Sequence, residues 1–155
     1  MGKLKVECFE KRLQLGKLLD AVYSVLKQTD NLKAELLFYN SFDMQALNRE
    51  TRNIDKVTDV LSYPTLDGIK GEILKKKDHF DLVEDGHILI GSIVLCEEKI
   101  KKQAKEYGNT YVQERNYLII HGLLHLLGYD HIDEKDKLEM RSKEKEILKI
   151  LGRED

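Results

Sequence analysis

The chain has 155 residues, of which 41% are hydrophobic and 35% are charged. This length is typical of one domain with its own core, and the composition excludes intrinsic disorder, collagen-like repeats and small disulfide-stapled folds. The formal net charge of -2 gives the protein as a whole no attraction for nucleic acid, so an RNA partner would need a local basic cleft.

No segment of the sequence is typical of a membrane span or a secretion signal. The uncharged stretch 117–129 is shorter than the roughly 20 apolar residues that cross a bilayer. Charged residues alternate with others through the first positions, where a signal peptide needs an apolar core. Cys8 and Cys96 form no CxxC pair and are predicted to be buried thiols in a reducing compartment. We therefore expect a cytoplasmic protein.

The first half of the chain predicts two strands, a helix between them, a second helix and a short extended segment. Four of these elements cover about 3–9 (strand), 14–28 (helix), 32–39 (strand) and 57–63 (extended). Ser41 and Asp43 supply capping chemistry for the second helix, which is expected to run to about Arg52. Pro64 ends the extended segment.

The second half predicts the centre of a sheet followed by three helices. The polar stretch 65–85 is expected to be a hairpin or a long solvated loop, and 87–96 is the most apolar strand candidate. The helices are expected at about 97–107, 111–127 and 133–151, the last opened by Asp133. We therefore predict a single α+β domain over 1–155, with a small mixed β-sheet and about five helices.

Three of the five histidines, His121, His125 and His131, lie close together in the sequence. On a helix His121 and His125 are one turn apart, so both rings project from one face and can bind one ion. Gly128 permits a left-handed turn that ends the helix and lets His131 return as a third ligand. Three imidazoles suit one zinc ion with a fourth position left for water, and other divalent transition metals fit the same ligands. The metal site is thus predicted on a helix of the C-terminal half and the turn after it.

Two other interpretations of these histidines stay open. They can be ordinary helix residues, as a single histidine on an apolar helix usually is. They can also belong to a closed structural zinc site, which needs a fourth protein ligand. The candidates for that ligand are distant in the sequence: Cys96, His79 and His87.

The spacing matches the long zinc-protease motif H-E-x-x-H-x-x-G-x-x-H except at one position. The protease uses the glutamate beside its first histidine as general base, and this chain has Gly122 there. Peptide hydrolysis by that mechanism is therefore not expected, and the absent side chain instead allows close helix packing or leaves space for substrate. Asp130 is a candidate for an alternative base or for a partner that orients a ligand, and equally for a plain turn residue.

A second group of polar residues lies in 48–64. Arg52 stands near the end of the second helix, and Thr58 and Ser62 are predicted on the polar side of the extended segment. Arg52 can present a planar guanidinium to a phosphate. Taken alone, however, an arginine near a helix C-terminus is usually a surface residue.

Two motifs together resemble the YbeY family of bacterial ribosomal RNA maturation factors. They are N-x-x-x-R-x-x-D-x-x-T-D-V-L-S-[FY]-P over 48–64 and H-G-x-L-H-L-x-G-Y-D-H over 121–131. The resemblance places His121, His125 and His131 on the family's zinc ligands and Arg52 on its essential arginine. It implies a metal-dependent endoribonuclease, specific for single strands, that processes the 3′ end of small-subunit rRNA and acts in ribosome quality control.

The chain departs from this pattern in the central strand. The family commonly has Gly-Asp-Ile where this chain has Gly91-Ser92-Ile93, so a carboxylate expected near the site is absent. Any role assigned to that carboxylate is therefore in doubt here, whereas the histidines and Arg52 are unaffected.

The residues predict metal-assisted cleavage of a phosphodiester. Zinc would lower the pKa of a bound water toward about 7, and Arg52 would stabilise charge on the phosphate oxygens. Either that water or an RNA 2′-hydroxyl could be the nucleophile, and the sequence does not choose. The lysines on 97–107 favour a solvated helix face over an RNA contact, because glutamates share that helix: Lys99, Lys101, Lys102 and Lys105.

The expected partner is single-stranded RNA of the small ribosomal subunit, with no DNA and no membrane, and the oligomeric state stays open. Two alternatives of other classes also stay open. One is an RNA-binding factor for ribosome assembly with a structural zinc ion. The other is a zinc hydrolase of a different substrate.

Overall fold

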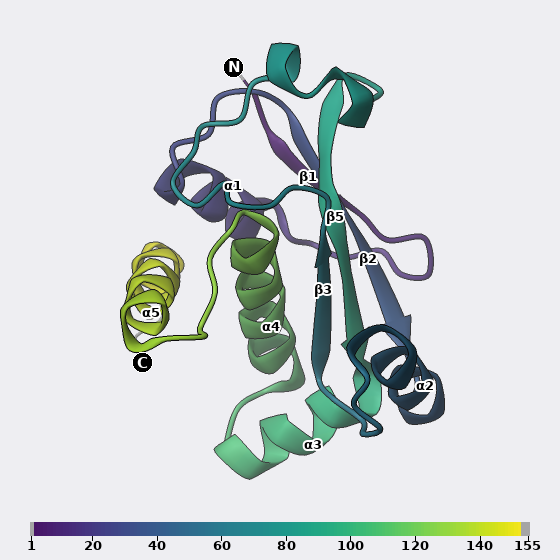
Figure 1. Ribbon diagram of the computed structural model, residues 1–155. Helices are drawn as coiled ribbons and strands as arrows, with labels where there is room; N and C mark the ends of the chain where they lie inside the picture. Colours follow the sequence, from purple (N-terminus) through teal and green to yellow (C-terminus); the bar gives the residue numbers. More distant parts are fainter. Residues whose placement is uncertain (1, 153–155) are drawn as a thin grey trace.

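The central strand of the protein is β5 (His87–Cys96), which pairs with three other strands (Figure 1). The computed structural model describes residues 2–152. The strand order is β1-β2-β5-β3, with β4 also beside β5. β1 and β2 run parallel to β5 and the other two antiparallel, so the predicted mixed sheet is confirmed. The remaining strands are β1 (Leu4–Glu7), β2 (Leu32–Tyr39), β3 (Val60–Pro64) and β4 (Val83–Glu84).

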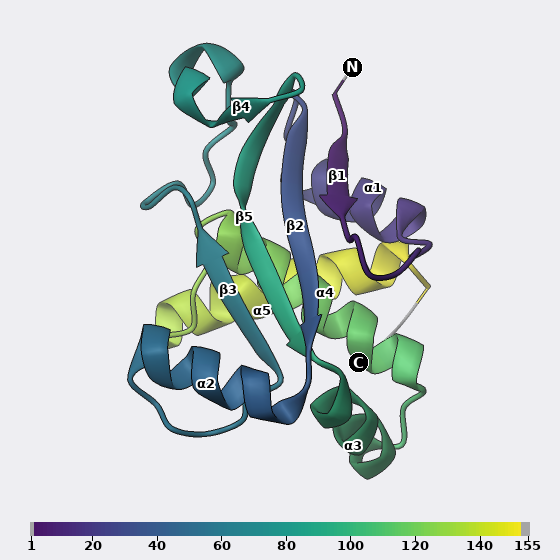
Figure 2. The same cartoon turned by 90° about the vertical axis from the view of Figure 1, so that its right-hand side faces the viewer.

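Five α-helices lie within the described residues, as the sequence predicts. They are α1 (Gly16–Val25), α2 (Ser41–Arg52), α3 (Glu97–Tyr107), α4 (Tyr111–Leu126) and α5 (Glu134–Ile150). Helices α1 and α4 cover one face of the sheet and α5 packs against them from outside, whereas α2 lies on the other face (Figure 1 and Figure 2). α3 follows β5 directly at the end of the sheet. This arrangement confirms the predicted α+β fold.

The helix starts show how local sequence sets the element boundaries. Asp133 accepts a hydrogen bond from the backbone N–H of Asp136 at 2.8 Å and opens α5, as predicted. The prediction that Ser41 and Asp43 cap α2 is wrong about which side chain accepts the capping hydrogen bond. The capping side chain is that of Asn40, which accepts from the backbone N–H of Asp43 at 2.8 Å. Asp43 instead places a negative charge in the first turn, where the helix dipole favours it.

Apolar side chains of β5 lie in two hydrophobic clusters, one on each face of the sheet, and a register shift against β2 interrupts their alternation between Leu89 and Gly91. The larger cluster contains Ile88, Ile90, Ile93 and Leu95 together with apolar residues of α1, α4 and α5. Val94 and Cys96 point to the opposite face and pack with Met44 of α2. The histidine-bearing helix α4 therefore lies on the face that carries the larger core.

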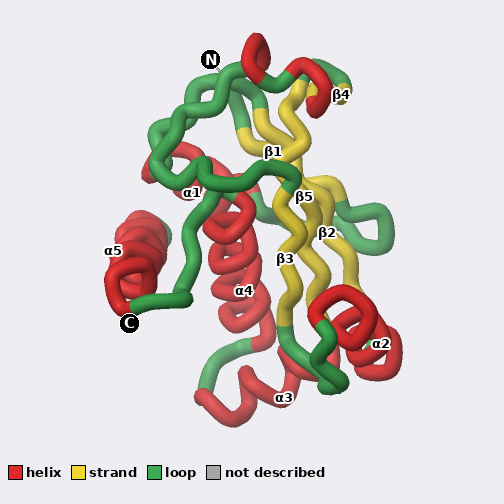
Figure 3. Tube along the Cα trace, in the orientation of Figure 1, coloured by secondary structure: helices red, strands yellow, loops and turns green. Residues whose placement is uncertain are grey.

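The segment between β3 and β4 is a long and largely exposed loop with two short 3-10 turns, as one of the two predictions for it describes, but two buried residues anchor it. Ile69 and Leu74 are 5% and 1% exposed and belong to the larger core. The side chain of Gln28 holds this segment, because it donates to the Glu72 carbonyl at 2.8 Å and accepts from the Leu74 N–H at 3.0 Å. Figure 3 shows the segment passing over the C-terminal end of α4. The alternative prediction, a hairpin within 65–85, is wrong, because the hairpin of this region is formed by β4 and β5 and lies at 83–96.

Both cysteines are free thiols. Cys96 is buried, as predicted, and its Sγ lies 3.8 Å from Oγ of Ser41. Cys8 is only partly buried, so the prediction of a buried thiol is wrong there. Among the described residues, no helix is both long enough and apolar enough to cross a bilayer.

Candidate metal centre

The structure brings His121, His125 and His131 together. His121 and His125 lie one turn apart on α4, with their Nε2 atoms 3.2 Å from each other. His131 comes from the loop between α4 and α5, and its ring centroid lies 5.1 Å from that of His125. One ligand nitrogen from each ring lies within 4.8 Å of the others. Three nitrogens at this separation fit the shell of a single transition-metal ion.

Gly128 makes the turn that returns His131 to the cluster. Its φ of +97° lies in the left-handed region, where a side chain is strained. A Cβ atom there would also lie 2.5 Å from the backbone nitrogen of Lys70. Glycine is therefore required both for the turn and for the passage of the segment after β3 over it.

His125 has the electronic state that a metal ligand needs. Burial, and after it the neighbouring His121, lower its pKa to about 4, so the ring is neutral at pH 7. A neutral imidazole has a free lone pair on one nitrogen. The donor set of three imidazoles thus fits zinc or a similar ion.

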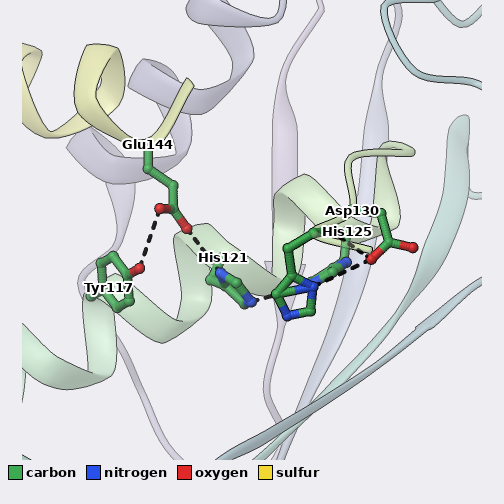
Figure 4. Close-up of polar contacts among 6 residues, drawn as sticks. Tyr117, His121, His125, Asp130 and Glu144 are labelled. Carbon is green, nitrogen blue, oxygen red and sulfur yellow. Dashed lines mark hydrogen bonds and ion pairs between the residues drawn. The ribbon is translucent and has the colours of Figure 1, made fainter. Parts of the chain in front are cut away.

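A buried carboxylate stands behind His121. Glu144 of α5 is 6% exposed, and its Oε2 lies 2.8 Å from Nδ1 of His121 (Figure 4). Its other oxygen accepts a hydrogen bond from the Tyr117 hydroxyl at 3.2 Å. Sequence reasoning missed both residues. A signal was present, since Glu144 is the charged residue on the buried stripe of α5 that also contains Met140, Ile147 and Leu148.

Asp130 has a structural part in the turn. Its Oδ1 accepts the backbone N–H of His131 at 2.7 Å and lies 3.4 Å from Nδ1 of the same residue. The Asp130 side chain is 44% exposed. Asp130 is thus a turn residue, as one of its predicted roles describes, and it also lies beside His131.

None of the three candidates for a fourth ligand joins the cluster. Within 2–152, the only group of three or more potential metal-binding side chains consists of the three histidines. Cys96 packs in the smaller core on the opposite face of the sheet. His87 contacts the Asp85 carbonyl at 2.9 Å in the hairpin turn, and His79 lies between two short 3-10 turns. These placements favour a site with an open position.

The histidines line one side of a cleft with a volume of about 650 Å³. The opposite side is formed by the end of α2, by β3 and by the chain between them, including Arg52, Thr58 and Ser62. Two groups that are far apart in the sequence, the histidines and Arg52, therefore share one cavity. Asn48 shapes this wall, because its side chain is buried and donates to the Lys56 carbonyl at 3.0 Å.

Arg52 is exposed but held in place. Its Nη2 donates to the Ser62 carbonyl at 2.6 Å, and its guanidinium carbon lies 5.2 Å from the ring centroid of Tyr63. The Tyr63 hydroxyl is itself 2.6 Å from that of Thr51. Stacking on the ring and one hydrogen bond fix the plane of the guanidinium and leave its other N–H groups free to bind an anion.

Comparisons with known proteins decide the family. The family profile described as Endoribonuclease YbeY matches residues 2–152. A protein of Clostridium botulinum (strain Loch Maree) named Endoribonuclease YbeY is 40% identical over 155 residues, which cover 96% of this chain and 92% of that protein. The chain belongs to the YbeY family. A namesake from strain Alaska E43 is 44% identical over 134 residues, with 81% of each chain covered.

A solved structure has the same fold as this YbeY family member. The solution structure of TM1509 from Thermotoga maritima superposes with a TM-score of 0.58 at 25% sequence identity. The match covers 98% of this chain and 90% of that one. The likeness in fold thus extends over 98% of the chain.

Ser92, the departure from the YbeY pattern, does not lie at the histidine cluster. It alternates with Ile93 along β5 and points to the face opposite α4, where its hydroxyl donates to Glu35 Oε1 at 3.1 Å. The expectation that this position lies near the site is therefore wrong in this structure. The physical reason is the register shift of β5 against β2 between Leu89 and Gly91. Strict alternation from Ile88 and Ile90 would put position 92 on the α4 side, whereas after the shift Ile93 lies there and Ser92 on the other side.

Proposed function

We propose that this protein is a metal-dependent endoribonuclease that cleaves single-stranded RNA and matures the 3′ end of small-subunit rRNA. One observation carries the proposal: three clustered histidines and an anchored arginine line one cleft in a chain of the YbeY family. The relatives are named endoribonucleases. A ribosomal RNA substrate also implies action in the cytoplasm, beside the small subunit.

We infer that His121, His125 and His131 hold one metal ion, with zinc favoured by the all-nitrogen donor set. When bound, such an ion supplies a Lewis acid and lowers the pKa of water toward neutrality. The protein's own part is to keep the rings neutral and oriented. Burial of His125 supports the neutral state of that ring, and the hydrogen bond between His121 and Glu144 supports the orientation of His121.

Arg52 is the residue that would bind the scissile phosphate. Its guanidinium carries a charge at any physiological pH, and its free N–H groups can pair with two phosphate oxygens at once. The contacts with Ser62 and Tyr63 fix its direction before substrate arrives. A preorganised cation of this kind stabilises the charge that develops on the phosphate oxygens in the transition state. Asp130 and the 2′-hydroxyl of RNA remain the candidates for a proton acceptor and an internal nucleophile.

The test combines metal analysis with a cleavage assay. Purified protein is expected to contain one equivalent of zinc, to cut single-stranded RNA faster than duplex RNA, and to lose cleavage but not its fold after chelation. Restored cleavage upon adding zinc completes the result. An RNA with one 2′-deoxy nucleotide at the cut site identifies the nucleophile. Equal cleavage by metal-free protein, or cleavage of peptide or ester substrates but not of RNA, would overturn the proposal.

A further inference from the structure

The buried carboxylate of Glu144 forms no ion pair with a lysine or arginine of residues 2–152. Within the described chain, its one ion-pair partner is His121. The side chain is only 8% exposed, on the face of α5 that packs into the core. An ionised carboxylate at such depth is costly unless it is paired and hydrogen-bonded. Its position therefore calls for a positive partner on the side of His121.

The contact with Glu144 points to which nitrogen of His121 carries the proton. When the carboxylate is ionised it can only accept hydrogen bonds, and the 2.8 Å contact then places the proton on Nδ1 of His121. Nε2 then carries the lone pair, and this is the atom that lies 3.2 Å from Nε2 of His125. Figure 4 shows Glu144 on one side of the His121 ring and His125 on the opposite side. The Tyr117 hydroxyl, one turn earlier on α4, donates to the other oxygen of Glu144 and orients the carboxylate.

We propose that Glu144 is a positioning residue for the histidine cluster, which holds His121 with Nε2 directed at the ion and thereby strengthens metal binding. The positive charge of the ion, transmitted through the imidazole, is the partner that the buried carboxylate lacks. The proposal rests on the proposed metal site and adds that α5 takes part in it. Carboxylates that orient ligand histidines typically change metal affinity 10- to 100-fold.

The first experiment measures zinc affinity by competition with a chromophoric chelator. Glu144→Leu removes the acceptor and places an apolar side chain of similar size on the buried stripe of α5, so the variant is expected to fold. Its zinc dissociation constant is expected to rise by about 10- to 100-fold. Glu144→Gln keeps an acceptor without the charge and is expected to show a smaller rise. Glu146→Gln is the control, because Glu146 lies two residues later and its side chain is 52% exposed.

The second experiment reads the His121 ring directly, without metal or activity. Nitrogen NMR of metal-free protein, at a pH where the ring is neutral, should show the proton of His121 on Nδ1 in the wild type. In Glu144→Leu the proton is expected to move toward Nε2. Should Glu144→Leu not fold, Glu144→Gln is read for both measurements.

The outcomes separate the two proposals. Tight zinc binding by the wild type with an unchanged dissociation constant in both Glu144 variants would overturn the positioning role and leave the metal site standing. Absence of zinc binding by every protein, the wild type included, would overturn the site and the role of Glu144 with it. A melting temperature that falls in metal-free Glu144→Leu while zinc affinity stays the same would make Glu144 a purely structural residue.

Discussion

Gly122 of α4 lies so close to Ile93 of β5 that a Cβ atom at position 122 would be 2.9 Å from Ile93 Cδ1. The same atom would lie 3.1 Å from Cγ1 and Cγ2 of Ile93, which is fully buried. The position at which zinc proteases carry their general base is therefore a contact between helix and sheet. Because Gly122 directly follows His121, this contact also sets how closely the histidine approaches β5.

We expect Gly122→Ala to lower the free energy of unfolding by about 1 kcal/mol. Overpacking against Ile93 costs about 1–3 kcal/mol, and the better helix propensity of alanine offsets about 1 kcal/mol of it. Gly16→Ala in α1 is the matched control, since nothing lies within 4 Å of a Cβ atom there, and it should be neutral or stabilising. Urea unfolding of both variants measures the difference. Gly122→Glu should be more destabilised than Gly122→Ala and should gain no activity on casein.

Gly128→Ala is expected to weaken both the fold and metal binding. Its φ of +97° strains any side chain, and the added Cβ would meet the Lys70 nitrogen at 2.5 Å. Gly108→Ala isolates the backbone strain, because φ is +70° there but nothing lies within 4 Å of an added Cβ atom. Left-handed strain alone costs roughly 1–2 kcal/mol. The loss of unfolding free energy should be larger for Gly128→Ala than for Gly108→Ala, and only Gly128→Ala should bind zinc more weakly. Equal behaviour of the two variants would contradict the close approach of the Lys70 backbone to Gly128.

Arg52→Ala is expected to affect catalysis and not the fold. The side chain is exposed, so its removal should change the free energy of unfolding by less than about 1 kcal/mol. Loss of one charge-assisted contact to the phosphate should slow RNA cleavage by about 10²- to 10³-fold. Arg52→Lys should recover activity only in part, because an ammonium lacks the planar pair of donors.

The matched control for Arg52 is Arg49→Ala. Arg49 lies in the last turn of the same helix and pairs with Asp55 at 3.1 Å. Thermal melting, zinc content and turnover are measured for each protein. Full activity in Arg52→Ala would remove the arginine from the mechanism, and parallel loss of melting temperature and activity would make it structural.

Ser92→Ala is expected to cleave RNA at the wild-type rate. The side chain contacts Glu35 on the face of the sheet that faces away from α4, so its removal leaves the cleft unchanged. Its lost hydrogen bond should cost at most about 1 kcal/mol of stability. A cleavage assay with matched melting curves is sufficient, and a tenfold fall in turnover at unchanged stability would show that this face of the sheet takes part in the reaction.

Local patterns predicted the elements of this fold well. The helix from Glu97 to Tyr107 and the strand from His87 to Cys96 have the predicted bounds, because apolar spacing and glycine punctuation are local signals. The buried positions of Ile69 and Leu74 were not predicted, because they depend on an anchor, Gln28, that is distant in the sequence.

The same distinction holds for the site. The three histidines could be found from their spacing, since they lie on one helix and the turn that follows it. The contact of Glu144 with His121 could not, because it depends on how α5 packs against α4. Likewise, the strand register that turns Ser92 away from the cluster follows from pairing with β2, which no local pattern records.

The strand order has a consequence for synthesis on the ribosome. Two neighbours of β5 in the sheet, β2 and β3, are made before it, and in the part of the chain that the structure describes β3 pairs only with β5. Until β5 emerges, β2 keeps an open edge and β3 has no partner strand in the sheet. Such long-range pairing is slow, and unpaired edges favour aggregation. The sheet can therefore form only after 87–96 has left the ribosome. The cleft forms later still, because the histidines that line one of its sides are made after that strand.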